Sequence, residues 1–173
     1  MTNIVLIGMP GCGKSTLGVI LAKALAYDFI DTDLLIGRRA GMTLQEYIDK
    51  NGTEAFGVLE DDVNSSVECE NTVIATGGSV VYCDRAMRHL HERGLVVYID
   101  IPYEEMCKRI LNFRTRGIVL KPGCTLLDLY CERGPLYMQN ADIIYKWEDG
   151  KSAEAAVEDI LALLEKAPAR DGD

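Results

Sequence analysis

The 173-residue sequence predicts an α/β fold, in which a parallel sheet lies between two layers of helices. Short apolar runs alternate with segments whose apolar residues recur at helical spacing, and this alternation continues along the whole chain. The first run, residues 4–7 (IVLI), is apolar at every position, as in a strand buried on both faces. A glycine-rich turn at residues 8–13 separates this run from the first helical pattern. Because parallel strands need crossover connections, the alternation favours a three-layer architecture.

The elements are predicted in the following order. Strands are expected at residues 4–7, 28–31, 72–75, 95–99 and 143–145. Helices are expected from Lys14, over 33–69 with breaks near Gly41 and Gly52, over 84–93, after Pro102, over about 125–140 and after Ser152. No internal repeat or linker divides the chain. We therefore predict one domain over residues 1–167, followed by a disordered tail at 168–173.

Cap signals mark several of these helix ends. Residues 43–46 (TLQE) have the form of a capping box, and Ser152 is expected to cap the last helix. Asp84 is expected to cap the helix over 84–93, and Gly94 is expected to end it.

Composition and charge exclude several classes of protein. The chain carries 18 Lys and Arg against 27 Asp and Glu, a net charge of −9, so it repels nucleic acid and anionic membranes. No apolar run is long enough to cross a bilayer, and no basic leader precedes the first apolar run. The 6 cysteines form no C-x-x-C pair, which argues against a zinc site and suits a reducing compartment. We therefore expect a cytoplasmic protein with no nucleic-acid or membrane partner.

Residues 8–15 (GMPGCGKS) match the phosphate-binding pattern G-x-x-x-x-G-K-[ST], with a predicted strand before them and a helix after them. Glycines let backbone N–H groups surround phosphates, and the helix dipole adds partial positive charge at the same place. We predict that ATP binds here, that Lys14 reaches the β- and γ-phosphates as a catalytic residue, and that Ser15 ligates Mg²⁺. The predicted nucleotide-binding residues of this segment are Gly11, Cys12, Gly13, Lys14, Ser15 and Thr16.

Two carboxylates, Asp31 and Asp33, lie at the end of the second predicted strand. Ligands of open α/β sheets bind at the carboxyl ends of the strands. Asp31 is therefore a candidate ligand of Mg²⁺, and Asp33 is a candidate to orient an attacking hydroxyl group or accept its proton. The alternative is that one of the two merely caps the next helix.

Glycines and arginines complete the set of candidate residues. Gly77 and Gly78 follow the third predicted strand, where a ligand can approach the backbone closely. Arg116 lies in an aperiodic segment at residues 112–123, and an arginine that closes over a γ-phosphate stabilises the transferred charge. Arg133 lies near a break in a predicted helix. Taken alone, either arginine fits a solvated surface charge better than a site residue.

These motifs together resemble the shikimate kinase family, within the nucleoside-monophosphate-kinase-like group of P-loop proteins. The resemblance covers about residues 3–165 and rests on the phosphate loop, Asp31-Thr32-Asp33, Phe56, Gly77-Gly78, Arg116 and Arg133 with Pro135-Leu136-Tyr137. It implies a three-layer P-loop kinase fold with strand order 2-3-1-4-5, an acceptor-binding region at about residues 33–61 and a lid at about 112–123. It also implies ATP-dependent phosphorylation of shikimate, a step of aromatic amino acid biosynthesis.

The resemblance assigns a role to each candidate residue outside the phosphate loop. Asp33, Gly77 and Gly78 would hold the hydroxyl groups of the acceptor, and Arg133 would pair with its carboxylate as a bidentate fork. Arg116 would come from the lid, and Arg109 would lie near the adenine.

Two positions depart from the family pattern. Gly57 stands directly after Phe56, where the family usually has an arginine that helps to bind the substrate carboxylate, and Ser79 replaces the third glycine of the cluster. Losing one charged hydrogen bond would cost on the order of 1.5–3 kcal/mol, roughly ten- to a hundred-fold in binding. Arg38 or Arg39, in the same region, could substitute for it.

Three functions therefore remain open. The first is phosphorylation of shikimate in a remodelled site. The second is the same chemistry on another small hydroxy acid or on a hydroxy amino acid such as homoserine, whose amine would need less positive charge nearby. The third is a nucleotide-dependent switch without an acceptor, although the sequence lacks the N-K-x-D motif of GTP-dependent switches. A kinase of this size can act as a monomer, because closure of a lid alone can exclude water.

Overall fold

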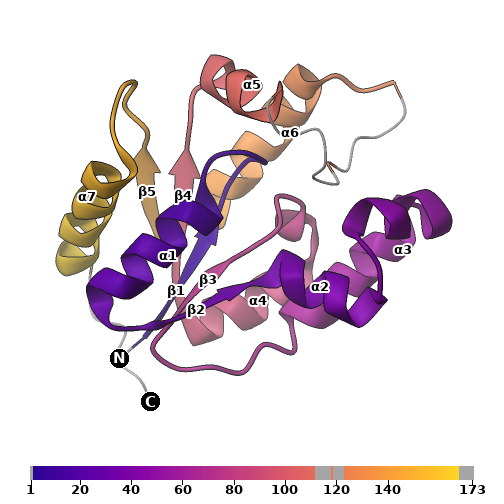
Figure 1. Ribbon diagram of the computed structural model, residues 1–173, viewed down its shortest axis with the longest axis horizontal. Coiled ribbons are helices and arrows are strands. Elements are labelled where there is room, and N and C mark those ends of the chain that lie inside the picture. The colour runs from indigo at the N-terminus through magenta and orange to yellow at the C-terminus, as the bar shows by residue number, and fades with distance from the viewer. Residues whose placement is uncertain (1, 112–117, 119–122, 168–173) are drawn as a thin grey trace.

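The computed structural model describes residues 2–111, 118 and 123–167. Most of the predicted lid, including Arg116, and the predicted tail lie outside these residues. The fold described below is that of the remaining chain, shown in Figure 1.

The described residues form a five-stranded parallel sheet in the order β2-β3-β1-β4-β5, which confirms the expected strand order. The strands are β1 (Asn3–Ile7), β2 (Asp28–Asp31), β3 (Thr72–Ala75), β4 (Gly94–Asp100) and β5 (Ile143–Lys146). All five residues of the central strand β1 are buried, in agreement with the apolar run at residues 4–7. The buried polar residue Asn3 is hydrogen-bonded through its side chain to Cys69, Arg93 and Thr72.

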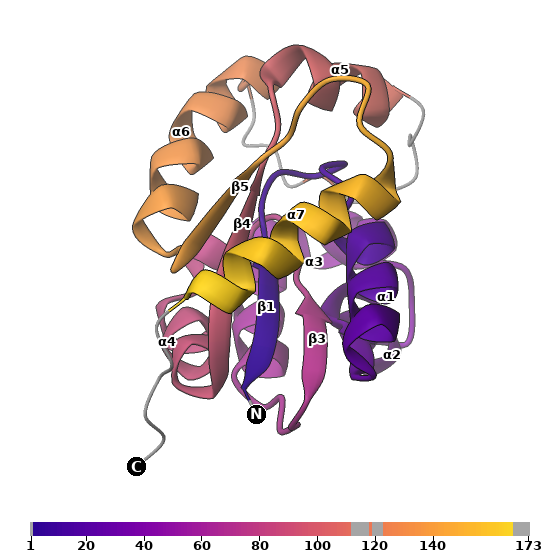
Figure 2. The ribbon, with the colours of Figure 1, turned by 90° about the vertical axis from the view of Figure 1, so that its left-hand side faces the viewer.

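Helices cover both faces of the sheet, as expected for parallel strands. They are α1 (Lys14–Leu25), α2 (Thr32–Ala40), α3 (Leu44–Asn64), α4 (Asp84–Arg93), α5 (Tyr103–Leu111), α6 (Leu126–Gln139) and α7 (Ala153–Lys166), with a short 3₁₀ turn at η1 (Val80–Tyr82). In Figure 2, α1 and α7 lie side by side across one face, whereas α3 and α4 pack together on the other. The three-layer prediction is confirmed.

The predicted breaks between residues 33 and 69 occur where glycines stand. Gly41 ends α2, and Gly52 has non-helical backbone angles inside α3, which places a kink in that helix. Thr43 caps α3 through a complete capping box with Glu46, and these hydrogen bonds lower the pKa of the Glu46 carboxyl group. Both predicted breaks are therefore confirmed, whereas α3 ends at Asn64 and not at residue 69 as expected.

Helix α4 has the predicted bounds, but the residues at its two ends act differently from expectation. Asp84 is the first residue of the helix and not its cap, because Cys83 occupies the cap position and makes no side-chain hydrogen bond there. Gly94 does not end the helix in a left-handed turn but begins β4 with an extended backbone. A Cβ atom at Gly94 would lie 2.7 Å from the carbonyl oxygen of Asn3 on the neighbouring strand. Close approach of two strands, and not termination of a helix, explains this glycine.

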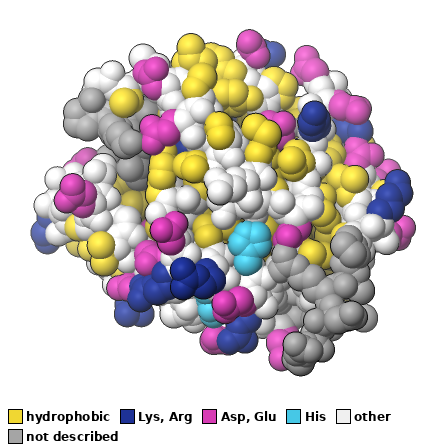
Figure 3. Space-filling view, turned by 180° about the vertical axis from the view of Figure 1, so that it is seen from behind, with side chains coloured by type: hydrophobic (Ala, Val, Ile, Leu, Met, Phe, Trp, Pro, Cys, Tyr) yellow, Lys and Arg dark blue, Asp and Glu magenta, His cyan; other side chains and the backbone are white. Residues whose placement is uncertain are grey.

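Among the described residues, no helix combines the length and the apolar character that a membrane crossing requires. On the face shown in Figure 3, acidic side chains lie among the basic ones.

We predict that Gly94→Ala destabilises the fold by about 1–3 kcal/mol, because the new methyl group meets a backbone carbonyl that cannot rotate away. Urea unfolding measures this loss. Gly134→Ala in α6 is the matched control, since a Cβ there meets no atom within 4 Å, and it should leave stability unchanged or raise it. Equal effects of the two substitutions would contradict this explanation of Gly94.

Candidate active site

The phosphate loop joins β1 to α1 at the carboxyl edge of the sheet. Gly8, Gly11 and Gly13 have φ angles of 146°, 77° and 99°, which L side chains rarely adopt. Gly13 occupies the cap position of α1 without any side-chain cap. The first N–H groups of this helix therefore need acceptors, and together with the helix dipole they favour a bound phosphate.

Lys14 lies almost completely inside this loop, with 8% of its surface exposed. Its Nζ atom donates hydrogen bonds to the carbonyl oxygens of Gly8 at 2.8 Å and Met9 at 3.0 Å. The loop carbonyls thus hold the ammonium group at the place where phosphate oxygens would meet it. Within the same predicted segment, Cys12 is fully buried and Thr16 is exposed in the first turn of α1.

Ser15 and Asp31, the two predicted ligands of Mg²⁺, contact each other. The Ser15 hydroxyl donates to Asp31 Oδ2 at 2.6 Å. The other carboxylate oxygen of Asp31 accepts from the backbone N–H of Asp33 at 3.0 Å and so caps α2. Asp31 therefore caps α2, as the alternative drawn from the sequence states, and it also faces Ser15. Its role as a ligand of Mg²⁺ stays a prediction. A hydroxyl and a carboxylate oxygen suit Mg²⁺, which takes few protein ligands and completes its shell with water and phosphate oxygens.

A cavity of about 820 Å³ extends from the phosphate loop between α2 and α3. Several predicted residues line it together, namely Gly11, Gly13, Lys14, Ser15, Asp31, Asp33, Gly77, Gly78 and Arg133. The structure thus brings the predicted nucleotide and acceptor residues to one site. Cys12, Thr16 and Arg109 do not line this cavity, and Arg116 lies outside the described residues.

Gly77 and Gly78 lie between several of the side chains that line the site. A Cβ atom on Gly77 would lie 2.8 Å from Asp33 Oδ1 and 2.5 Å from Glu60 Oε1. A Cβ atom on Gly78 would lie 3.0 Å from the ring of Pro10 and 3.2 Å from Arg133 Nη1. Side chains at these positions would push apart the two carboxylates, the phosphate loop and the arginine.

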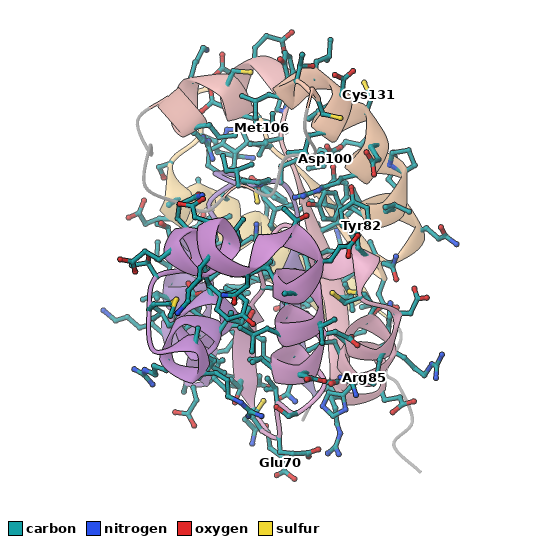
Figure 4. The ribbon with its side chains drawn as sticks, turned by 90° about the vertical axis from the view of Figure 1, so that its right-hand side faces the viewer. Glu70, Tyr82, Arg85, Asp100, Met106 and Cys131 are labelled. Carbon is teal, nitrogen blue, oxygen red and sulfur yellow. The ribbon has the colours of Figure 1, made fainter. Side chains whose placement is uncertain are left out.

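Arg133 is a buried arginine of α6, with 2% of its surface exposed. Its guanidinium group lies 5.2 Å from the ring centroid of Tyr82, and its Nε donates to the Tyr82 hydroxyl at 3.4 Å. Tyr82 lies between α3 and α6 in Figure 4 and donates to Glu132 at 2.9 Å. One turn after Arg133, Tyr137 donates to the carbonyl oxygen of Gly78 at 2.5 Å and so fastens α6 to the glycine pair. A buried cation held beside an open cavity is suited to pairing with a carboxylate.

Arg109 lies behind the phosphate loop and not in the cavity. Its Nη1 donates to the carbonyl oxygen of Cys12 at 3.1 Å, and its Nε donates to Glu105 at 2.8 Å. This hydrogen bond lowers the pKa of the Glu105 carboxyl group. The guanidinium group also stacks on Trp147 at 4.2 Å from the ring centroid. Trp147, the only tryptophan of the chain, is not among the residues predicted from the sequence.

Glu60 is a second residue of the site that was not predicted from the sequence. It is fully buried on α3, and its Oε2 atom accepts a hydrogen bond from the Ser79 hydroxyl at 2.5 Å. Burial raises the pKa of this carboxyl group to about 7. A signal was present in the sequence, because Glu60 lies four residues after the buried Phe56 and so shares its face of the helix.

The two departures from the family pattern lie near each other in space. Gly57 lines a second cavity of about 630 Å³, which shares Phe56, Glu60, Ser79 and Arg133 with the first. A Cβ atom at Gly57 meets no atom within 4 Å, so this position has room for a side chain. Of the two arginines proposed as substitutes, Arg38 lines the main cavity, whereas Arg39 lines neither.

Comparisons with known proteins agree with this geometry. The shikimate kinase family model matches residues 10–165. The shikimate kinase of Paracidovorax citrulli is 39% identical over 97% of this chain and 94% of its own, and that of Aquifex aeolicus is 36% identical over 94% and 96%. The structure of shikimate kinase from Acinetobacter baumannii in complex with shikimate superposes with a TM-score of 0.85 at 31% identity, covering 96% of this chain and 94% of that one. A deoxyadenosine kinase from M. mycoides, 16% identical with a TM-score of 0.65, shares the fold.

We predict that Tyr137→Phe lowers the free energy of unfolding by about 1–3 kcal/mol, because the buried carbonyl of Gly78 loses its donor. Chemical unfolding provides the measurement. Tyr145→Phe is the matched control, since the buried Tyr145 hydroxyl has no hydrogen-bond partner in the described structure and its removal should cost nothing. An unchanged stability of Tyr137→Phe would refute the role of this hydrogen bond.

Proposed function

The chain belongs to the shikimate kinase family, and from this membership we propose that it transfers the γ-phosphoryl group of ATP to a hydroxyl group of shikimate, giving shikimate 3-phosphate. The observation that carries the proposal is the shared cavity, because Lys14 of the phosphate loop and the acceptor residues Asp33 and Arg133 all line it. The reaction is a step of aromatic amino acid biosynthesis.

The nucleotide half of the site consists of the phosphate loop and the start of α1. The loop N–H groups and Lys14 bind the β- and γ-phosphates, and Arg109 with Trp147 lies on the far side of the same loop, where the adenine is proposed to bind. Ser15 and Asp31 would hold Mg²⁺, which neutralises phosphate charge when it is bound. Arg116, outside the described residues, is proposed to stabilise the transferred group from the lid.

The acceptor half is built from three elements. Asp33 on α2 orients the attacking hydroxyl group and accepts its proton, while Gly77 and Gly78 let the acceptor approach the backbone. Arg133 on α6 pairs with the acceptor carboxylate. In this arrangement the carboxylate is anchored at one end of the acceptor and the reacting hydroxyl group is held at the other, which lowers the entropic cost of reaching the transition state.

On the same basis we propose the location, the oligomeric state, the partners and the domain bounds of the protein. The chain acts as a cytoplasmic monomer with no nucleic-acid or membrane partner, in keeping with its net charge of −9. It is one domain over residues 1–167, with an acceptor region at about 33–61 and a lid at about 112–123.

The position of Gly57 supports a second candidate function. With no guanidinium group at this position, and with Arg38 largely exposed, the acceptor site holds less buried positive charge than the family pattern implies. Another small hydroxy acid, or a hydroxy amino acid such as homoserine, is therefore the alternative acceptor. A switch without an acceptor is not favoured, because the phosphate loop opens into a cavity lined by acceptor-binding groups.

The test is formation of ADP from ATP, measured with shikimate, homoserine and other hydroxy acids in turn. We expect turnover that requires both Mg²⁺ and shikimate. Lys14→Ala should abolish it, a loss of at least about 10³-fold, while the far-UV circular dichroism spectrum stays unchanged. Turnover with another acceptor that exceeds that with shikimate would refute the proposed substrate, and an active Lys14→Ala variant would refute the role of the phosphate loop.

We predict that Gly57→Arg lowers KM for shikimate by roughly ten- to a hundred-fold, because a guanidinium group enters the open space beside Glu60 and Arg133 and adds a charged hydrogen bond to the substrate carboxylate. Steady-state kinetics measure this gain. Gly57→Gln, which adds a polar but uncharged side chain, is the control and should not reproduce it. A KM that is unchanged or raised in Gly57→Arg would show that the carboxylate is bound elsewhere.

A further inference from the structure

Tyr82 contacts the buried arginine of the acceptor site with both its ring and its hydroxyl group. The ring centroid lies 5.2 Å from the guanidinium carbon of Arg133, and the hydroxyl oxygen accepts a hydrogen bond from Arg133 Nε at 3.4 Å. This hydrogen bond is long and therefore weak, whereas the ring lies within the usual range of a cation–π contact. Because Arg133 keeps only 2% of its surface exposed, water is largely excluded from the contact, which strengthens it.

Glu132, the neighbour of Arg133 on α6, orients the hydroxyl group of Tyr82. The hydroxyl donates to Glu132 Oε1 at 2.9 Å, and because it has one hydrogen its oxygen is left to accept from Arg133 Nε. Adjacent residues of a helix do not face each other, so Glu132 and Arg133 can share this partner only because Tyr82 comes from another element. Tyr82 therefore joins an exposed carboxylate to a buried guanidinium group.

The short turn η1 fixes the position of Tyr82. Val80 of this turn is fully buried in the core, and the N–H of Tyr82 donates to the carbonyl oxygen of Ser79 at 3.0 Å. Side chains three residues apart on a 3₁₀ helix lie on the same side, and Ser79 and Tyr82 accordingly both line the second cavity. Since η1 follows the glycine pair almost directly, one segment places the phenol ring and the backbone that the acceptor approaches.

The Arg133 guanidinium group reaches from the second cavity to the first. A Cβ atom on Gly78 would lie 3.2 Å from Arg133 Nη1, so this nitrogen lies beside the glycine pair. Arg133 lines both cavities, whereas Tyr82 lines the second and not the first. The phenol thus holds the Nε side of the arginine and leaves Nη1 at the acceptor. A guanidinium group binds a carboxylate in a fixed fork geometry, so its orientation decides how many of these hydrogen bonds form.

The departure at Gly57 makes this orientation more important. The family pattern places a second arginine there, whereas Gly57 brings no side chain to the wall that Tyr82 also lines. Among the described residues that line the main cavity, Arg133 is the only buried arginine, and Arg38 is exposed. Binding of a carboxylate in this chain therefore depends on a single well-placed guanidinium group.

We propose that Tyr82 is a positioning residue of the acceptor site: its ring and hydroxyl group hold Arg133 so that the Nη side of the guanidinium group meets the carboxylate of the acceptor. This inference rests on the proposed function, because it concerns the acceptor of that same cavity. Tyr82 acts through Arg133, whose side chain is ordered before the acceptor arrives. The cost of ordering it is then not subtracted from the binding free energy.

The experiment measures KM and kcat with shikimate, and the Kd of shikimate by calorimetry, in Tyr82→Phe and Tyr82→Leu. Tyr82→Phe keeps the ring and loses only a long hydrogen bond, so both KM and Kd should rise roughly two- to fivefold. Tyr82→Leu also loses the ring and should raise both roughly ten- to fiftyfold. The carboxylate is bound alike in the ground state and the transition state, so kcat should stay within about twofold, and KM for ATP should not change.

A double-mutant cycle with Arg133→Lys tests whether Tyr82 acts through Arg133. Lysine keeps the positive charge but has no Nε–H group to reach the Tyr82 hydroxyl. Arg133→Lys alone should raise KM for shikimate roughly tenfold, since the fork is lost. In this background Tyr82→Phe should change KM by less than about twofold. Effects of the two substitutions that multiply would show that Tyr82 acts independently and would overturn the proposal.

Tyr130→Phe provides the matched control. Tyr130 lies on the same helix as Arg133, its hydroxyl donates to the carbonyl oxygen of Ile101 at 3.0 Å, and it lines neither cavity. Loss of this hydroxyl group removes a hydrogen bond as Tyr82→Phe does, but it should leave KM for shikimate unchanged. Thermal unfolding of all the variants separates a loss of stability from a loss of acceptor binding.

The outcomes separate this inference from the proposed function. Turnover of shikimate with the same KM in the wild-type chain and in both Tyr82 variants would overturn the role of Tyr82 and leave the kinase activity standing. Binding of shikimate that weakens in these variants as expected, but without ADP formation, would refute the proposed function and support the role of Tyr82. A matching rise of KM in Tyr130→Phe, a raised KM for ATP in the Tyr82 variants, or no binding of shikimate at all would also overturn the inference.

Discussion

The register of three parallel strands is the constraint on which the whole site depends. Leu6 of β1 and Asp31 of β2 both pair with Ala75 of β3, so the three strands end level with one another. The carbonyl oxygen of Leu6 then accepts from the backbone and hydroxyl groups of Thr76, which carries this alignment one residue further. The phosphate loop, the two aspartates and the glycine pair therefore leave the sheet at one edge. A shift of one residue in any strand would reverse the direction of its side chains and separate these groups.

The parts of the molecule that could be predicted from the sequence are those encoded by neighbouring residues. The three layers could be predicted from the alternation of apolar segments. The phosphate loop could be predicted because it is one contiguous motif, and Asp33 could be predicted because it stands just after a strand. The strand order came from the family resemblance and could not follow from the alternation alone, since several orders satisfy the same connections. Gly94 was misinterpreted because a glycine after a helix is ordinary, and the nearby carbonyl of Asn3 belongs to a strand at the other end of the sequence.

The features that could not be predicted join residues far apart in the chain. Ser79 meets Glu60 across 19 positions, and Arg109 reaches Cys12 across 97. Neither contact can be recognised from a periodic pattern in the sequence, because each depends on how the helices pack on the sheet. The same holds for the burial of Arg133, which the sequence alone could not distinguish from a surface charge.

Although the chain is acidic, Lys14 and Arg133 are both buried in the wall of one cavity, so positive charge lies where anions are expected to bind.

The stacking of Arg109 on Trp147 gives the molecule an intrinsic optical probe. The chain has one tryptophan, so its emission comes from a single place. The indole of Trp147 is half-buried just after β5, and its ring centroid lies 4.2 Å from the guanidinium group of Arg109. The same guanidinium group donates a hydrogen bond to the carbonyl oxygen of Cys12 in the phosphate loop. The indole also makes an edge contact with Tyr145. Any rearrangement of the loop that moves Arg109 changes the polarity and the quenching around the ring. A nucleotide whose binding displaces Arg109 would therefore be detected in solution by fluorescence, without a label and without turnover.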